Sequence, residues 1–240
     1  MLGGMWVVPL AASIVALGFA GLLARRSLGR VRPAELLWAL ALLMYAAASF
    51  ALFLGVLDGW SPAEYRVYWL FGAVLNVPYL AAGELLLLVR DRRVWIAALV
   101  LLVFATAFAV ARIRTAPLDA AALAADLPRG ADAWSVDATA LDLARLYAFP
   151  TYAFLVGGTL WAAWRMRRYP DLRDRFLDTL AIAIGATVVA AGSAFAASGN
   201  VAGFSVTLAA GIAVMFWGFL RATGRSAASD ARPVPADRPA

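Results

Sequence analysis

The sequence predicts an all-α membrane protein with seven transmembrane helices, its N-terminus outside and its C-terminus inside. Three observations support this. Of the 240 residues, 64% are hydrophobic and 15% are charged, whereas a soluble domain has roughly 45–50% and about 25%. Apolar runs of membrane-spanning length recur along the chain, and the arginines between them fall mainly on one side. This composition excludes a soluble globular enzyme and a disordered chain.

The apolar runs have the length that a bilayer requires, about 20 residues. Seven are present, at Met5–Ala24, Glu35–Leu57, Val67–Val89, Val94–Val110, Leu146–Trp164, Leu177–Ala197 and Val201–Leu220. The first lacks the positively charged start of a signal peptide and exceeds its usual apolar length of about 7–15 residues, so we expect it to be retained. The last two are separated only by Ser198, Gly199 and Asn200, which suits a tight hairpin because Gly and Asn tolerate positive φ.

The arginines predict the orientation. Of 21 arginines, 16 lie on one side of these spans, together with the C-terminal tail, and five lie on the other. Positively charged loops stay on the cytoplasmic side. This asymmetry explains the net charge of +6 without a nucleic-acid partner, and contact with anionic membrane lipids is a secondary expectation. An Ala-rich chain whose basic residues are all Arg suggests a GC-rich genome, and we therefore expect a multi-pass protein of a bacterial inner membrane.

Two segments lie outside the predicted bundle. Residues 1–221 should form the seven-helix domain. Residues 222–240 should form a disordered cytoplasmic tail, because they are Ala, Ser, Pro, Arg and Asp without periodicity. The longest loop, 114–142, is expected outside. Its Ala-rich stretch predicts a short surface helix that starts near Thr115 and stops at Pro128.

Three residue types are missing, and their absence limits the chemistry. The sequence contains no Cys, no His and no Lys. This excludes a disulfide, a thiolate nucleophile, the usual zinc and haem ligand, and a Schiff base. The sequence also shows no serine triad and no phosphate-binding loop. We therefore expect no cofactor, no metal site and no enzymatic activity.

Polar and aromatic residues share one face of the third span. Trp69, Gly72, Asn76, Tyr79 and Gly83 follow one another at helical spacings. The second and fifth spans carry similar faces. The three faces predict an aromatic, weakly polar pocket for a hydrophobic or aromatic small molecule. The candidate ligand-binding residues are Tyr45, Ser49, Trp69, Asn76, Tyr79, Tyr147 and Thr151.

Prolines and carboxylates add two further expectations. Pro78 and Pro150 each remove a backbone donor within a span and should kink it. At the inner helix ends we expect an ionic cluster with the arginines, comprising Glu35, Glu84 and Asp178. A proton-coupled carboxylate at Glu84 is the alternative. The alternative for the aromatic faces is ordinary helix packing, with Trp and Tyr at the membrane interfaces.

Small residues dominate the last two spans. They recur every seven or every four positions, at Gly185, Gly192, Gly199, Gly203, Thr207 and Gly211. Such spacings let two helices approach closely. We expect the sixth and seventh spans to pack tightly, and the alternative is a face for a homo-oligomer or another membrane protein.

One segment resembles a known family. Residues 68–79, Tyr-Trp-Leu-Phe-Gly-Ala-Val-Leu-Asn-Val-Pro-Tyr, with Arg-Asp-Arg-Arg at 90–93, look like the third helix of the seven-helix sensor module that precedes bacterial histidine kinases. The resemblance covers one helix, and no kinase follows in the sequence. It implies a receptor-like protein that acts through a partner. The chain also resembles microbial rhodopsins in helix count and orientation, but without Lys it cannot attach retinal.

Three function classes remain open. A sensor-like, ligand-binding bundle predicts a one-sided pocket that opens to the outside. A small-solute or lipid transporter predicts a polar path across the membrane, with the proline kinks as hinges. A non-catalytic assembly partner predicts a stable complex and no pocket. We favour ligand binding because of the face around Asn76 and Tyr79.

Overall fold

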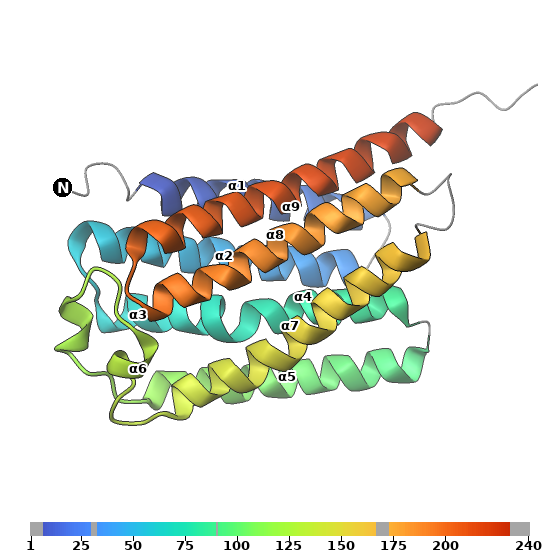
Figure 1. Cartoon of the computed structure of the whole chain (residues 1–240). Helices are drawn as coiled ribbons and strands as arrows, with labels where there is room; N and C mark the ends of the chain where they lie inside the picture. The colour runs from blue at the N-terminus through green and yellow to red at the C-terminus, as the bar shows by residue number, and fades with distance from the viewer. Residues whose placement is uncertain (1–6, 30–32, 90, 167–172, 231–240) are drawn as a thin grey trace, which may run out of the picture.

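The computed structural model describes residues 7–29, 33–89, 91–166 and 173–230. This part of the chain is helical, without strands, which confirms the all-α prediction. Long helical segments lie side by side along most of its length (Figure 1). Their bounds are α1 Val7–Gly29, α2 Pro33–Asp58, the continuous α3 Pro62–Tyr68, η1 Trp69–Leu75 and α4 Asn76–Leu88, then α5 Arg92–Thr115, α7 Thr139–Met166, α8 Arg173–Ala197 and α9 Val201–Asp230.

Five of these segments are long and apolar enough to cross a membrane. They are Val7–Arg25, Pro33–Asp58, Pro62–Leu88, Arg92–Thr115 and Val201–Gly218. Among the described residues α7 is not one of these five segments, and the apolar stretch of α8, Ile184–Ala197, is shorter. A helical membrane protein is therefore supported, and the fifth and sixth spans remain expectations.

The segments surround a shared core, and α5 lies at the edge. Helix α1 packs between α2 and α9, α4 packs on α2 and α7, and α8 packs on α7 and α9. Within the described residues the main contacts of helix α5 are with α4, η1 and α7, and α5 lies at the lower edge of the bundle in Figure 1. Its apolar side chains are exposed, with Leu101 and Phe104 each 67% accessible. In a bilayer such a face needs no protein partner, because lipid tails are as apolar as Leu.

The third segment changes helix type before Pro78. It begins with a capping box, in which Ser61 and Glu64 satisfy each other's backbone N–H groups, and with Pro62 at the first position. Residues Trp69–Leu75 are π-helical, and α-helix resumes at Asn76. Pro78 has no N–H to offer the carbonyl of Val74. The π-helical stretch includes Val74, the residue whose carbonyl Pro78 leaves without a donor.

The loop between α5 and α7 differs from its prediction. Instead of one helix from Thr115 to Pro128, it contains the short 3₁₀ helix η2 Ala122–Ala124 and the helix α6 Gly130–Ala133. The Asp119 carboxylate accepts from Ala121 N–H, and Asp119 N–H donates to the carbonyl of Ala133. These two bonds fold the Ala-rich stretch back on itself, so it does not propagate as a helix.

The hairpin of α8 and α9 confirms the expected close packing. An added Cβ at Gly185 would lie 2.5 Å from Met215 Cγ and 2.6 Å from the carbonyl oxygen of Gly211. Gly199 turns the chain with φ of +73°. Helix α9 continues to Asp230, so residues 222–230 are helical where a disordered tail was expected. Residues 231–240 of that predicted tail lie outside the described residues.

The two ends of the helical bundle carry different loops. The loop end carries residues 116–138 and the α8–α9 turn, at the left of Figure 1. The arginine end carries the α1–α2, α4–α5 and α7–α8 connections. The arginines at this end whose side chains the structure describes are Arg25, Arg92, Arg93, Arg165 and Arg221.

Candidate functional site

A cavity of about 280 Å³ lies in the half of the bundle nearer the arginine end. Helices α1, α2, α4, α7, α8 and α9 all contribute to it. Its lining residues are Phe19, Leu23, Trp38, Leu42, Leu80, Glu84, Leu87, Leu88, Leu155, Val156, Thr159, Ala162, Ala186 and Met215. Most are apolar, and the volume is close to the lower end of the range for small-molecule sites, about 300–1,000 Å³.

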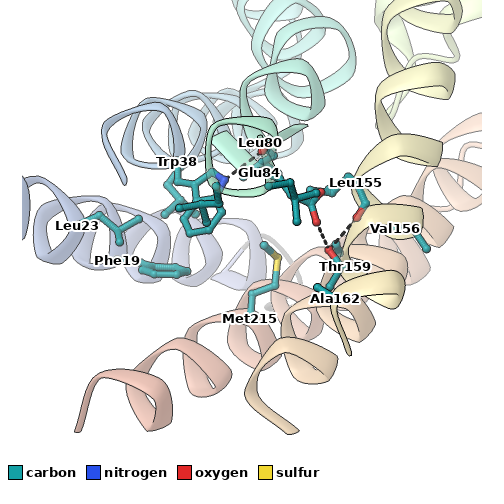
Figure 2. Close-up of a pocket in the computed structure, with 14 residues that line it drawn as sticks. Phe19, Leu23, Trp38, Leu80, Glu84, Leu155, Val156, Thr159, Ala162 and Met215 are labelled. Atoms are coloured by element: carbon teal, nitrogen blue, oxygen red, sulfur yellow. Dashed lines mark hydrogen bonds between the residues drawn. The ribbon is translucent and has the colours of Figure 1, made fainter. Parts of the chain in front are cut away.

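Glu84 is the acidic residue among these lining residues. Its side chain is 7% exposed. The Thr159 hydroxyl of α7 lies 2.8 Å from Glu84 Oε1, whereas Oε2 is shielded and has no hydrogen-bond partner. An added Cβ at Gly158 would lie 3.0 Å from Oε1, so Gly158 leaves room for the carboxyl group against α7. Figure 2 shows Glu84 and Thr159 joined across the two helices.

Trp38 forms another wall of the cavity. Its indole lies against Gly83 of α4, where an added Cβ would collide with Cδ1 and Nε1. The indole N–H donates to the carbonyl of Leu80 at 3.0 Å. Together with Phe19 and Met215 it faces the same space as Glu84 (Figure 2). A glycine on α4 therefore positions an aromatic wall beside the carboxyl group.

A smaller cavity of about 50 Å³ adjoins the first. It extends toward the middle of the bundle, where Tyr45, Asn76 and Tyr152 line it. The residues that line both cavities are Leu42, Leu80, Leu155, Ala186 and Met215. The two cavities are therefore neighbours that share part of their walls.

Two of the predicted ligand-binding residues line this smaller cavity. The Tyr45 hydroxyl donates to the carbonyl of Leu208 on α9 at 2.7 Å, and Asn76 Nδ2 donates to the carbonyl of Ala41 on α2 at 2.7 Å. Both polar groups therefore also tie neighbouring helices together. Packing and cavity lining, which the sequence offered as alternatives, coincide at these positions.

The other predicted ligand-binding residues line neither cavity. Trp69 donates to the carbonyl of Ala140, Tyr147 donates to the carbonyl of Ala105, and the Tyr79 hydroxyl lies 3.1 Å from that of Thr106. Thr151 donates to the Tyr147 carbonyl of its own helix, and Ser49 is 2% exposed within α2. These contacts are interhelix or intrahelix bonds, as in the packing alternative.

The structure describes the predicted ionic cluster only in part. Of its three members, Glu84 lines the cavity. Glu35 lies in the first turn of α2. Asp178 belongs to α8, and its side chain lies outside the described residues. Sequence reasoning did not identify Thr159, because its pairing with Glu84 joins residues 75 positions apart.

Aromatic side chains close the loop end. Tyr65 and Trp69 both pack on Trp134 of the loop, with ring centroids 5.8 Å and 6.0 Å away. The Trp60 indole donates to the carbonyl of Asp126, and Arg66 donates to the carbonyls of Ile113 and Ala116. The loop is therefore fastened to the bundle, and the larger cavity lies toward the opposite end.

Comparison with known proteins adds no relative. Neither a family model, nor a curated protein, nor a solved structure matches the chain. Within the described residues, no three acidic side chains gather in a way that would hold a metal ion.

Proposed function

We propose that this chain is a seven-span membrane protein that binds an apolar small molecule in the cavity around Glu84. The cavity itself supports the proposal. It gathers side chains from six helices around a volume suited to a small ligand, and it contains a buried carboxyl group with one oxygen unpartnered. An ionisable group within a span costs roughly 2.5–3.5 kcal/mol at the bilayer centre, and it commonly indicates a functional site.

The proposal includes an orientation. Short loops rich in Arg remain cytoplasmic, and the described arginines Arg92, Arg93 and Arg165 lie at the arginine end. That end, and with it the Glu84 half of the bundle, is therefore placed inside. Because the sequence has no Cys, a single cysteine can be introduced without first replacing any native cysteine. In right-side-out vesicles a membrane-impermeant maleimide should label Ala131→Cys and spare Arg93→Cys, and the reverse pattern would refute this orientation.

Binding is tested by filling the cavity. Ala186 lines both cavities, so Ala186→Leu should occupy shared space. Ala153→Leu, on the exposed face of α7, adds the same volume elsewhere. We expect wild type in lipid nanodiscs to retain radiolabelled decanol above the level of empty nanodiscs, and Ala186→Leu to bind it about tenfold more weakly, or 1.4 kcal/mol. Retention no greater than that of empty nanodiscs, or equal binding by wild type and Ala186→Leu, would refute the proposal.

A lipid or small-solute transporter is the second candidate. It is favoured by the shared lining of the two cavities, which extend from the Glu84 half toward Tyr45 and Asn76 in the middle of the bundle. A transporter must open this path alternately to both sides. The test measures decanol uptake by proteoliposomes and by protein-free liposomes. If the protein binds decanol but does not speed its uptake, the transporter is refuted and sensing through a partner is left as the function.

A further inference from the structure

We infer that the cavity selects a cationic amphiphile, a long-chain amine whose ammonium group binds Glu84 and whose hydrocarbon chain lies along the apolar walls. The inference rests on the proposed binding function and adds the chemical class of the ligand. It follows from the balance of donors and acceptors in the cavity, from the charge of its lining and from the way it meets the bilayer.

Acceptors outnumber available donors around Glu84. The Thr159 hydroxyl lies 2.8 Å from Glu84 Oε1 and 2.7 Å from the carbonyl oxygen of Leu155. A hydroxyl has a single hydrogen, so it cannot fully satisfy both. Glu84 Oε2 has no donor at all. The Trp38 N–H is already engaged with the carbonyl of Leu80. A ligand that binds the ionised form of Glu84 therefore needs hydrogen-bond donors of its own.

The charge of the lining favours a cation over a neutral donor. Among the described residues that line the cavity there is no arginine, so within this part of the chain no basic side chain faces the Glu84 carboxylate in the cavity. An unpaired carboxylate in apolar surroundings is costly, and a charge-assisted hydrogen bond relieves that cost better than a neutral one. The same carboxylate would repel an ionised fatty acid or a phosphate group.

The remaining walls suit a hydrocarbon chain. From Glu84 they continue through Leu42, Leu80 and Met215 into the smaller cavity. Leu87 lines the larger cavity and is also 59% exposed on the outside of the bundle. One wall of the cavity therefore reaches the lipid-facing surface. An amphiphile dissolved in the adjacent leaflet would therefore meet the cavity wall at Leu87.

The test compares decylamine, decanol and decanoic acid, which share chain length and differ in the polar group. Radiolabelled forms are dialysed against the protein in phosphatidylcholine nanodiscs, and uptake by empty nanodiscs is subtracted. We expect decylamine to bind at least about tenfold more tightly than decanol, the ratio expected for a charge-assisted hydrogen bond, and decanoic acid to bind most weakly. In Glu84→Gln the preference for the amine should disappear.

Two further variants serve as a control and as a second test. Glu64→Gln, at the loop end, removes a carboxylate far from the cavity, and Gln can maintain the capping box. It should keep the wild-type order. Thr159→Val removes the hydroxyl that donates to Glu84 in place of a ligand, so it should keep or increase the preference for the amine. This variant provides a second test if Glu84→Gln does not fold. Binding of all three probes with equal affinity, or an unchanged order in Glu84→Gln, would overturn the inference while the binding function stands. Binding of none would overturn both.

Discussion

Gly83 is the position where one added methyl group should disturb both the fold and the cavity. In Gly83→Ala the new Cβ collides with Cδ1 and Nε1 of Trp38 and lies 3.1 Å from the carbonyl oxygen of Ala34. The indole must move away from α4. It then loses its hydrogen bond to the Leu80 carbonyl and moves into space that the cavity now provides.

The size of this effect follows from three contributions. Overpacking of a tight contact costs about 1–3 kcal/mol, and loss of one hydrogen bond costs about 1 kcal/mol. The better helix propensity of Ala offsets roughly 1 kcal/mol. We therefore expect a net loss of about 1–3 kcal/mol. At about 2–4 °C per kcal/mol for a chain of this size, the Tm should fall by several degrees.

The assay is thermal unfolding of the detergent-solubilised protein, followed by tryptophan fluorescence. Gly157→Ala is the matched control, because an added Cβ there meets nothing within 4 Å. It should be neutral or slightly stabilising. In a Trp38→Leu background the cost of Gly83→Ala should largely vanish, since the colliding ring is gone. A Gly83→Ala protein as stable as wild type, or an equal cost in both backgrounds, would refute this account of the α2–α4 contact.

Two other predictions concern the stability of the fold. Gly185→Ala should separate α8 from α9 and lower stability by about 1–3 kcal/mol, because its Cβ would lie 2.6 Å from the Gly211 backbone oxygen; Gly18→Ala, with open space around it, is the control, and equal Tm values would contradict the prediction. The hydrogen bonds from the Thr139 hydroxyl and N–H, with Arg112 nearby, hold the pKa of Asp137 below its usual value. Its stabilising effect is therefore present above the unfolded pKa of about 3.9 and lost as the pH falls through the lower folded value. The Tm difference between wild type and Asp137→Asn should shrink in that acidic window, and a difference that is constant with pH would contradict it.

The helices could be predicted because hydropathy and helix length are local properties. Val94–Val110 was expected to be a span, and α5 contains it with one further turn or more at its C-terminal end. The turn at Gly199 and the close packing at Gly185 and Gly211 also follow from residue type and spacing. The loop helix could not be predicted in this way. Its Ala-rich sequence favours a helix, but the bond from Asp119 N–H to the distant Ala133 carbonyl selects another shape.

The candidate site was only partly accessible from sequence. Asn76 and Tyr45 were identified from helical spacing, and they do line the smaller cavity. Spacing along one helix cannot show which polar groups are already bonded across helices, as Trp69 is to the Ala140 carbonyl. Nor can it pair Glu84 with Thr159, because that contact depends on how α4 and α7 come together and on the absence of a side chain at Gly158.

The central claim is that the cavity around Glu84 holds an apolar ligand, and photolabelling tests it most directly. A decylamine analogue with a diazirine in its chain is irradiated with the protein in nanodiscs, and the labelled peptides are sequenced by mass spectrometry. We predict labelling on residues 80–88 of α4 and 155–162 of α7, which supply most of the lining, and its displacement by excess decylamine. Labelling confined to the exposed face of α5, around Phe104, or labelling that decylamine does not displace, would contradict the claim.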